Sequence, residues 1–439
     1  MNRILFVGAP FGGFTRDVLP GFEQRGCRVW RVAFDGGDRM ETPRRFRVAF
    51  PDRGGNWAAF VRQFIVGNRI DTVVVFNDCL PRQAAALRIA EQLGARTFAF
   101  ENAYFRPTWV TLERGGINAR SRLPRSIAFY RAEAARHPAQ PPPRVARSHL
   151  TGLTRDTIAH YFWSYLLAPL IPFDSRAYGV SVGEQGRGYA ATFLAGLLRN
   201  DRGVVPAIAA AKAAMPPGAR VTAVLLQKPC DTQISMSSGF LGNCDFVREA
   251  ITSFAAHAPR GSLLVVKEHP LDFGIERCAA FVAALAASFG IGDRVFFVRN
   301  IPIDRMMPLA DAMVTINSTG GLAGLKAGIP VICLGRAFYD MAGLTFQGKL
   351  DAFWSTGERA APEDVAAFRS YVVASAQVNG GFHSRAARAV LRETFVARVL
   401  SETPFAHERM SDPQRLAFGV VGAGNARHRA AEAARQTKR

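Results

Sequence analysis

Polar side chains that could take part in binding or catalysis follow an apolar run in the second half of the sequence. Residues 263–266 (LLVV) are followed at once by Lys267, Glu268, His269 and Pro270. A lysine adds a positive charge suited to a phosphate, and the proline fixes the backbone just past the histidine. This pattern favours a phosphate-binding site, with a purely structural histidine as the alternative.

A second polar segment, NSTGG at 317–321, follows the apolar run VTI and precedes a predicted helix. Hydroxyl groups and free backbone N–H groups at a helix N-terminus make an anion site, so Asn317, Ser318, Thr319 and Gly320 are candidate ligands. The alternative is a plain helix cap by Ser318 or Thr319, and a cap can coexist with phosphate binding.

An aspartate flanked by amides follows the apolar run 221–226, in the order Gln227, Asp231, Gln233. Neutral hydrogen bonds from amides keep a carboxylate ionised without pairing it permanently, which suits a nucleophile or a base. A helix-capping aspartate is the alternative.

The first half offers a second carboxylate in the same kind of position. Glu101 follows the apolar run TFAF directly, where it could act as a general acid or base, although a surface carboxylate explains it equally well. Asn77, Asp78 and the glycine-rich GAPFGG at 8–13 line the same predicted edge. The glycines do not fit G-x-G-x-x-G, so a dinucleotide site is poorly supported.

The elements that position these residues are apolar runs that alternate with helical patterns. One such alternating series covers the first hundred residues, and a second begins after residue 202. Such alternation predicts an α/β fold of two Rossmann-like, doubly wound parallel-sheet domains facing a cleft. The predicted boundaries are 1–135 for an acceptor-side domain, 136–200 for a linker or insertion, 201–375 for a donor domain, and 376–439 for C-terminal helices and a basic tail.

Composition narrows the class of partner. The net charge of +20 implies attraction to an anion, but no nucleic-acid motif occurs, so nucleic-acid binding is not expected. The segment HYFWSYLLAPLIPF (160–173) is too short to span a membrane. It could contact a headgroup layer, or it could be a buried helix.

The cysteines and the acidic motifs indicate the cellular location of the protein and whether it needs a metal ion. Six cysteines without a C-x-x-C pair, and an N-terminus unlike a signal peptide, predict a reducing, cytosolic location. No His/Cys cluster has metal spacing, and D-x-D is missing. We therefore expect no metal, and a donor carrying a single phosphate.

These motifs together resemble a known family. FENAYFRPTWVTLERGGINARSRLP, VVVFNDCLP, QKPCDTQI, KEHPLD and TINSTGGLAGLKAGIPVICLG resemble the KpsS/LipB-type capsule polysaccharide synthesis proteins, which are related to the KpsC/LipA group of bacterial Kdo transferases. The resemblance runs from about residue 6 to 354, with an interruption between about 134 and 199.

The resemblance implies a GT-B-like fold and a retaining transfer of Kdo from CMP-β-Kdo to phosphatidylglycerol or its lyso form, which starts the poly-Kdo linker of a capsule. It implies a protein on the cytoplasmic surface of the inner membrane, working with an anionic glycerophospholipid and other capsule assembly proteins. A different acidic sugar or acceptor, or a non-catalytic export or scaffold role, stays open.

Roles carry over by position. Asp231 would be the nucleophile and Glu101 the acid/base. This chain has Glu101-Asn102-Ala103-Tyr104 where relatives often have E-E-G-Y or E-D-G, so the second acid and the glycine are missing. The remaining positions form two sets. The donor side would use Lys267, His269, Pro270, Asn317, Ser318, Thr319, Gly320, Gln227 and Gln233, and the acceptor side Asn77, Asp78, Arg106, Gly12 and Gly13.

Overall fold

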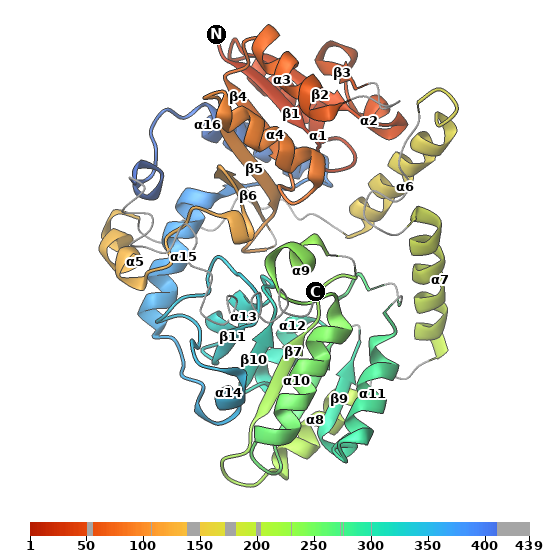
Figure 1. Cartoon of the computed structure of the whole chain (residues 1–439), viewed down its shortest axis with the longest axis vertical. Coiled ribbons are helices and arrows are strands. Elements are labelled where there is room, and N and C mark those ends of the chain that lie inside the picture. Colours follow the sequence, from red (N-terminus) through yellow and green to blue (C-terminus); the bar gives the residue numbers. More distant parts are fainter. Residues whose placement is uncertain are drawn as a thin grey trace. The chain divides into compact units, whose positions relative to one another are not determined.

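The apolar runs predicted as strands form parallel strands in two sheets of the computed structural model (Figure 1). It describes residues 1–50, 56–106, 108–137, 150–171, 181–198, 203–229, 231–272, 274, 276–299 and 301–410. These residues form two compact units. The first unit contains 1–124, 133–171 and 369–410, and the second contains 125–132 and 181–368.

The first unit is built on a seven-stranded sheet. Its strands are β1 (Arg3–Val7), β2 (Arg28–Ala33), β3 (Arg47–Ala49), β4 (Thr72–Phe76), β5 (Arg96–Asn102), β6 (Trp109–Arg114) and β12 (Gln377–Asn379). The strand order is β12-β6-β5-β4-β1-β2-β3, with β1 to β5 parallel. β6 runs antiparallel to both β5 and β12.

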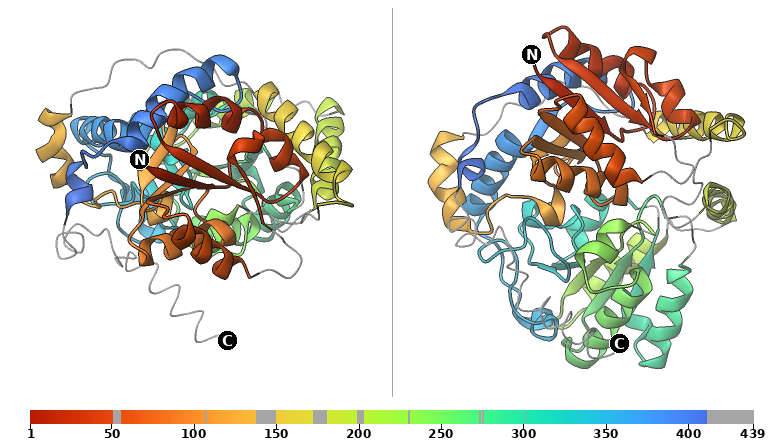
Figure 2. Two further views of the ribbon diagram at one scale, coloured as in Figure 1. Left: turned by 90° about the horizontal axis from the view of Figure 1, so that it is seen from above. Right: turned by 45° about the horizontal axis from the view of Figure 1, so that its top comes forward.

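Helices cover both faces of this sheet. The helices of the unit are α1 (Phe14–Glu23), α2 (Gly36–Glu41), α3 (Trp57–Gly67), α4 (Pro81–Gln92), α6 (Leu150–Leu166) and α16 (Arg385–Leu400), of which α6 packs against α2. One apolar cluster packs α1 and α16 around Phe6, and the other packs α3 and α4 around Leu5, since alternate residues of β1 face opposite sides. Figure 2 shows the blue C-terminal helix beside the red N-terminal elements.

The return of the chain into the first unit departs from the predicted boundary at 375. Residues 376–410 are not a separate segment, because β12 pairs with β6 and α16 buries Phe395 and Val399 in the first core. Within the described residues, the chain passes between the units after residue 124, within α5 (Ile127–Glu133) and within α15 (Pro362–Ala376). The rest of the predicted tail, 411–439, lies outside the described residues.

The second unit has five parallel strands, β7 (Val221–Leu225), β8 (Leu263–Lys267), β9 (Val295–Val298), β10 (Ala312–Thr315) and β11 (Val331–Cys333), in the order β11-β10-β7-β8-β9. Its helices are α7 (Val182–Leu198), α8 (Val204–Ala213), α9 (Thr232–Ser237), α10 (Asn243–His257), α11 (Cys278–Ser288), α12 (Ile303–Met306), α13 (Gly321–Lys326) and α14 (Leu350–Thr356). Phe254 and Trp354 pack edge to face in its core.

The two sheets share one topology. Numbered within each unit, the first five strands have the order 3-2-1-4-5, which reverses between β1 and β4 and again between β7 and β10. Loops at such a reversal diverge at the carboxyl ends of the strands and leave room for a ligand. The predicted α/β fold with two Rossmann-like units, as a GT-B-like protein requires, is confirmed. The predicted cleft between them stays a prediction.

α6 is amphipathic, but it buries its polar face and exposes its apolar face. Its polar Asp156, His160 and Ser164, each four residues after the last, are buried, whereas Ile158, Phe162, Tyr165 and Leu166 are exposed. The exposed residues Ile158, Phe162 and Leu166 also follow at intervals of four, so they form a stripe on the opposite face. Residues 172–173 of the predicted membrane-contacting segment lie outside the described residues.

His160 fastens α6 to α2. Its Nδ1 lies 3.2 Å from Oε1 of Glu41 and its Nε2 lies 3.5 Å from Oδ2 of Asp35. Burial lowers the pKa of His160, but hydrogen bonds and charges from the two carboxylates outweigh it and raise that pKa to about 10. A Cβ at Gly37 would lie 2.5 Å from Nδ1 of His160, so only glycine permits this close approach.

Candidate functional site

Two segments that carry predicted residues come together where the strand order of the second sheet reverses. Leu225 of β7 pairs with Thr315 of β10, so the segments that leave these strands start side by side. The segment after β7 carries Gln227 and Asp231, and the segment after β10 carries Asn317. Nδ2 of Asn317 donates to the carbonyl oxygen of Gln233 at 3.2 Å, which links the two segments directly.

Asp231 is held by two neutral donors. Its Oδ1 accepts from the backbone N–H of Gln233 at 2.9 Å, which caps α9, and its Oδ2 accepts from Nε2 of Gln227 at 3.3 Å. Burial raises the pKa of Asp231, and the two hydrogen bonds offset part of that rise. Among the described residues it forms no ion pair. The structure therefore holds a buried carboxylate that caps a helix, and the positive charge of Lys228 also lowers the pKa of this carboxylate.

Two buried amide oxygens of these two segments have no hydrogen-bond partner among the described residues, Oε1 of Gln227 and Oδ1 of Asn317. Because Nε2 of Gln227 faces a carboxylate, its oxygen must point the other way. A buried acceptor left unsatisfied costs roughly 1–3 kcal/mol. These oxygens are suited to accept hydrogen bonds from the N–H or O–H groups of a ligand.

Lys267 places a buried cation at the end of the neighbouring strand, β8. Its Nζ donates to the carbonyl oxygen of Glu268 at 3.0 Å, and the described residues give it no second partner. The carboxylate of Glu268 instead contacts Nε of Arg299 at 3.1 Å. Burial lowers the pKa of Lys267. An ammonium with two unused donors suits a phosphate.

His269 and Pro270 follow on the surface side of Lys267. Nδ1 of His269 accepts from the backbone N–H of Leu271 at 3.0 Å, so the neutral ring carries its proton on Nε2. The histidine is half-buried and Pro270 is exposed. Lys267 and His269 therefore occupy the predicted strand end, and their binding roles stay predictions.

The predicted free N–H groups of the 317–321 segment are mostly engaged within the chain. The amide of Gly320 donates to Oγ of Ser318 at 3.1 Å, and the next three amides bond to carbonyls three residues back. α13 is also only six residues long. The expectation of open amides was wrong here because Ser318 closes a tight turn. The hydroxyls of Ser318 and Thr319 remain suited to an anion.

Glu101 lies within β5 rather than after it. The strand continues to Asn102 because β6 turns back and pairs Glu101 with Thr111. Oε2 of Glu101 accepts from Nδ2 of Asn118 at 2.9 Å, and the carboxylate is half-buried. Asn118 has a left-handed φ of 54°, which aims its side chain back at the strand.

Asp78, which follows β4, holds the loop whose Asn118 contacts Glu101. Oδ2 of buried Asp78 accepts from the backbone N–H of Ile117 at 2.9 Å, and burial raises the pKa of Asp78. Asn77 turns the chain with φ 62° and accepts from the N–H of Cys79 at 3.1 Å. Asp78 thus anchors the loop, and Arg106 is exposed.

Gly12 and Gly13 are packed against the chain's own side chains. A Cβ at Gly12 would lie 2.5 Å from Cγ of Asp156, and one at Gly13 would lie 2.6 Å from Nη2 of Arg388. The backbone N–H of Gly12 also donates to Oε1 of Glu41 at 2.8 Å. This loop is therefore braced by α6 and α16, and no described contact joins it to Glu101.

Sequence reasoning missed Asn243, the first residue of α10. Its fully buried side chain accepts from the N–H of Gln227 and donates to the carbonyl of Gln227, both at 2.9 Å. Asn243 therefore fixes the backbone from which the Gln227 side chain reaches Asp231. A polar residue opening a helix after a strand's carboxyl end is the signal that could have found it.

Comparison with known proteins assigns the family. Residues 71–383 match the model of the capsule polysaccharide biosynthesis protein family, and the chain belongs to that family. It is 31% identical over 388 residues to the capsule polysaccharide export protein KpsS of Escherichia coli, which covers 87% of this chain and 97% of that protein. It is 29% identical over 391 residues to the capsule polysaccharide modification protein LipB of Neisseria meningitidis, covering 88% and 92%.

Solved structures are more distant. The KpsC β-Kdo 2,7 transferase of Thermosulfurimonas dismutans is 14% identical, covers 84% of this chain and 99% of its own, and has a TM-score of 0.37. HepE of Anabaena, in complex with UDP and glucose, is 12% identical, with coverages of 91% and 96% and a TM-score of 0.31. The two Rossmann-like units are defined by the strand order of the two sheets described above.

Proposed function

We propose that this protein is a retaining glycosyltransferase that moves Kdo from CMP-β-Kdo to phosphatidylglycerol or its lyso form, and so starts the poly-Kdo linker of a capsule. Membership of the capsule polysaccharide biosynthesis family supports a role in capsule assembly. The observation that carries the proposal is the hydrogen bonding at the strand-order reversal of the second sheet, where Gln227 donates to Asp231 and Asn317 donates to the carbonyl oxygen of Gln233.

The donor fits the groups at this edge. The ammonium of Lys267, with Nε2 of His269 and the hydroxyls of Ser318 and Thr319, would bind the phosphate of CMP. The unsatisfied oxygens of Gln227 and Asn317 would accept from hydroxyl or amino groups of the nucleotide. A single phosphate needs one such cation, so the transfer requires no metal.

Retention of configuration follows from two displacements. The carboxylate of Asp231 attacks the anomeric carbon while the bond to the phosphate oxygen breaks, and CMP leaves with that electron pair. The acceptor hydroxyl then attacks the same carbon, gives its proton to Glu101 and displaces Asp231. The raised pKa of Asp231 suits this step, because a more basic carboxylate is a better nucleophile.

The exposed apolar face of α6 supports contact with the inner-membrane surface. Ile158 and Phe162 are 64% and 58% exposed on a helix whose polar face is buried. An apolar stripe on a protein of net charge +20 suits the boundary of an anionic bilayer. No helix of the described residues is long and apolar enough to cross a membrane. We propose that α6 rests on the cytoplasmic leaflet beside the lipid acceptor.

The proposal is tested by mass spectrometry of lyso-phosphatidylglycerol incubated with the full chain and enzymatically generated CMP-Kdo. We expect one added Kdo with the wild type and none with Asp231→Asn, which keeps the cap of α9. Asp311→Asn, at the amino edge of the same sheet, is the matched control and should keep the activity. Failure of the wild type while CMP still raises its Tm would move the search to another sugar or acceptor. Failure without any effect of CMP would favour a non-catalytic export or scaffold role.

A further inference from the structure

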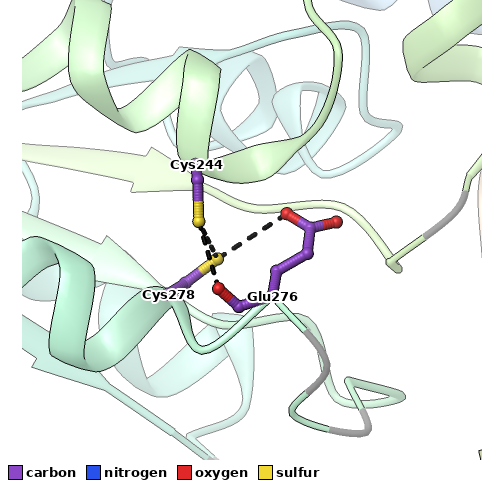
Figure 3. A group of neighbouring side chains, drawn as sticks. All are labelled: Cys244, Glu276 and Cys278. Carbon is purple, nitrogen blue, oxygen red and sulfur yellow. Dashed lines mark hydrogen bonds between the residues drawn. The ribbon is translucent and has the colours of Figure 1, made fainter.

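Two cysteines and a glutamate meet at the starts of α10 and α11, beside the candidate site (Figure 3). Sγ of Cys244 lies 3.5 Å from Sγ of Cys278, although the residues are 34 positions apart. Sγ of Cys278 lies 3.8 Å from Oε2 of Glu276. The three side-chain ligand atoms all lie within 4.8 Å of one another. The fold thus creates a cluster that no sequence spacing indicated.

We propose that Cys244, Cys278 and Glu276 bind a divalent zinc-type ion. Thiolate and carboxylate ligands are typical of zinc, and its tetrahedral sites keep sulfur atoms roughly 3.8 Å apart given Zn–S bonds of about 2.3 Å. The observed 3.5 Å separation needs only a small adjustment. Three protein ligands leave a fourth position for water.

The surroundings of the cluster favour a cation. Sγ of Cys244 lies 3.2 Å from the carbonyl oxygen of Glu276, and Sγ of Cys278 lies 3.8 Å from the carboxylate of Glu276. Among the described residues, neither Glu276 nor Asp272 forms an ion pair with a basic side chain, so no positive charge is paired with these carboxylates. A divalent cation would supply that charge and ionise the thiols.

The glutamate is already oriented for coordination. The backbone N–H of Asn243 donates to Oε2 of Glu276 at 2.8 Å, and Nδ2 of Asn243 lies 3.4 Å from Oε1. Metal-binding carboxylates are commonly held by such hydrogen bonds. Asn243 also forms two hydrogen bonds with the backbone of Gln227. An ion bound to Glu276 would therefore help to fix the position of Gln227 in the candidate site. No step of sugar transfer passes through the ion, and the inference does not depend on the proposed function.

The test uses the reduced, tag-free full chain, freed of metal by a chelator and titrated with Co²⁺. We expect one cobalt per chain, a thiolate-to-cobalt charge-transfer band in the near ultraviolet, and the strong visible bands of tetrahedral cobalt. Cys244→Ser and Cys278→Ser should lower the affinity at least tenfold and weaken the charge-transfer band. Glu276→Gln should keep the band but weaken binding. Cys27→Ser, a buried cysteine of the first unit, is the matched control.

Three results would overturn the inference: a wild type without the charge-transfer band, an undiminished band in the Cys278→Ser variant, or a Cys244–Cys278 disulfide in the protein as purified. If the serine variants do not fold, X-ray absorption of the wild-type cobalt protein decides instead. Two sulfur scatterers would support the site, and a shell of oxygen or nitrogen alone would refute it.

Discussion

Nε2 of Gln227 donates to Oδ2 of Asp231 at 3.3 Å, and this orientation leaves Oε1 of Gln227 buried without a partner among the described residues. The amide therefore supports the carboxylate while its own oxygen goes unsatisfied. Asp231 in turn carries a charge that burial disfavours. Such local conflicts are expected at functional sites, where they persist because the ligand relieves them.

Asp231→Asn is expected to abolish transfer and to stabilise the fold at neutral pH by about 1 kcal/mol. The raised pKa means that the folded protein loses stability as the pH rises through the folded-state pKa of Asp231 and the side chain ionises. Asparagine removes that charge and still caps α9. Urea unfolding at neutral and acid pH measures the gain, which should vanish at acid pH. A destabilised variant at neutral pH would contradict this account.

Lys267→Met should weaken the binding of CMP by about 10- to 100-fold, the value of one or two hydrogen bonds to a charged group. The fold should tolerate the change, because methionine fills the space of a buried ammonium that has no ion pair among the described residues. Isothermal titration with CMP gives the affinity. Lys212→Met, which breaks a contact with Asp311 at the amino edge, is the control and should bind CMP normally.

Glu101→Gln separates acceptor chemistry from donor binding. Loss of a general base should lower kcat by about 100-fold or more, whereas the affinity for CMP should not change. Glutamine keeps an oxygen that can accept from Asn118. Glu91→Gln, which alters an exposed pair with Arg122, serves as the control for steady-state kinetics. Equal activity in the two variants would remove Glu101 from the mechanism.

The ion pairs of His160 predict that the first unit loses stability at alkaline pH. Because its pKa rises from 6.5 to about 10 on folding, its contribution is complete below pH 6.5 and disappears as the pH rises towards 10. His160→Gln should cost about 3 kcal/mol at pH 6, as expected when one partner of a buried charge group is removed. The difference from wild type should shrink at pH 9. Denaturant unfolding compares both with His257→Gln, whose exposed pairing with Asp351 is weak.

The apolar stripe of α6 can be tested with vesicles. Replacing Ile158, Phe162 and Leu166 together by serine should reduce binding to phosphatidylglycerol vesicles at least tenfold, since each buried apolar side chain is worth about 1.5–3 kcal/mol. The affinity for CMP should not change. A matched triple variant at Met236, Leu241 and Phe289, which are exposed in the second unit, should bind vesicles like the wild type. Equal loss in both triple variants would exclude a specific role for α6.

The fold was largely predictable because most of its parallel strands are buried on both faces. Continuous apolar runs such as 4–7, 73–75 and 263–266 have no other simple explanation, and each became a strand. The return of residues 377–400 to the first sheet was not predictable. β12 is only three residues long, and its antiparallel partner β6 lies far away in the sequence.

The candidate site was predictable only in part. Polar residues after strands identified Gln227, Asp231 and Asn317, because strand order brings such ends together. Contacts that depend on the direction of a side chain could not be predicted, such as the two hydrogen bonds that Asn243 forms with the backbone of Gln227. The closed turn at Ser318 was hidden for the same reason: sequence shows which amides could be open, and only geometry shows where they donate.

The path of the chain through the two units has a consequence for biosynthesis. The second unit is inserted into the first, since residues 369–410 complete a sheet that begins at Arg3. A ribosome therefore finishes residues 181–368 of the second unit while β6 still has an unpaired edge and Phe6 and Phe14 still lack Phe395. During synthesis the nascent amino-terminal half therefore exposes apolar surface and an unpaired strand edge, which favour aggregation. A chain truncated near residue 368 lacks β12 and α16, so its first unit cannot complete its sheet and core.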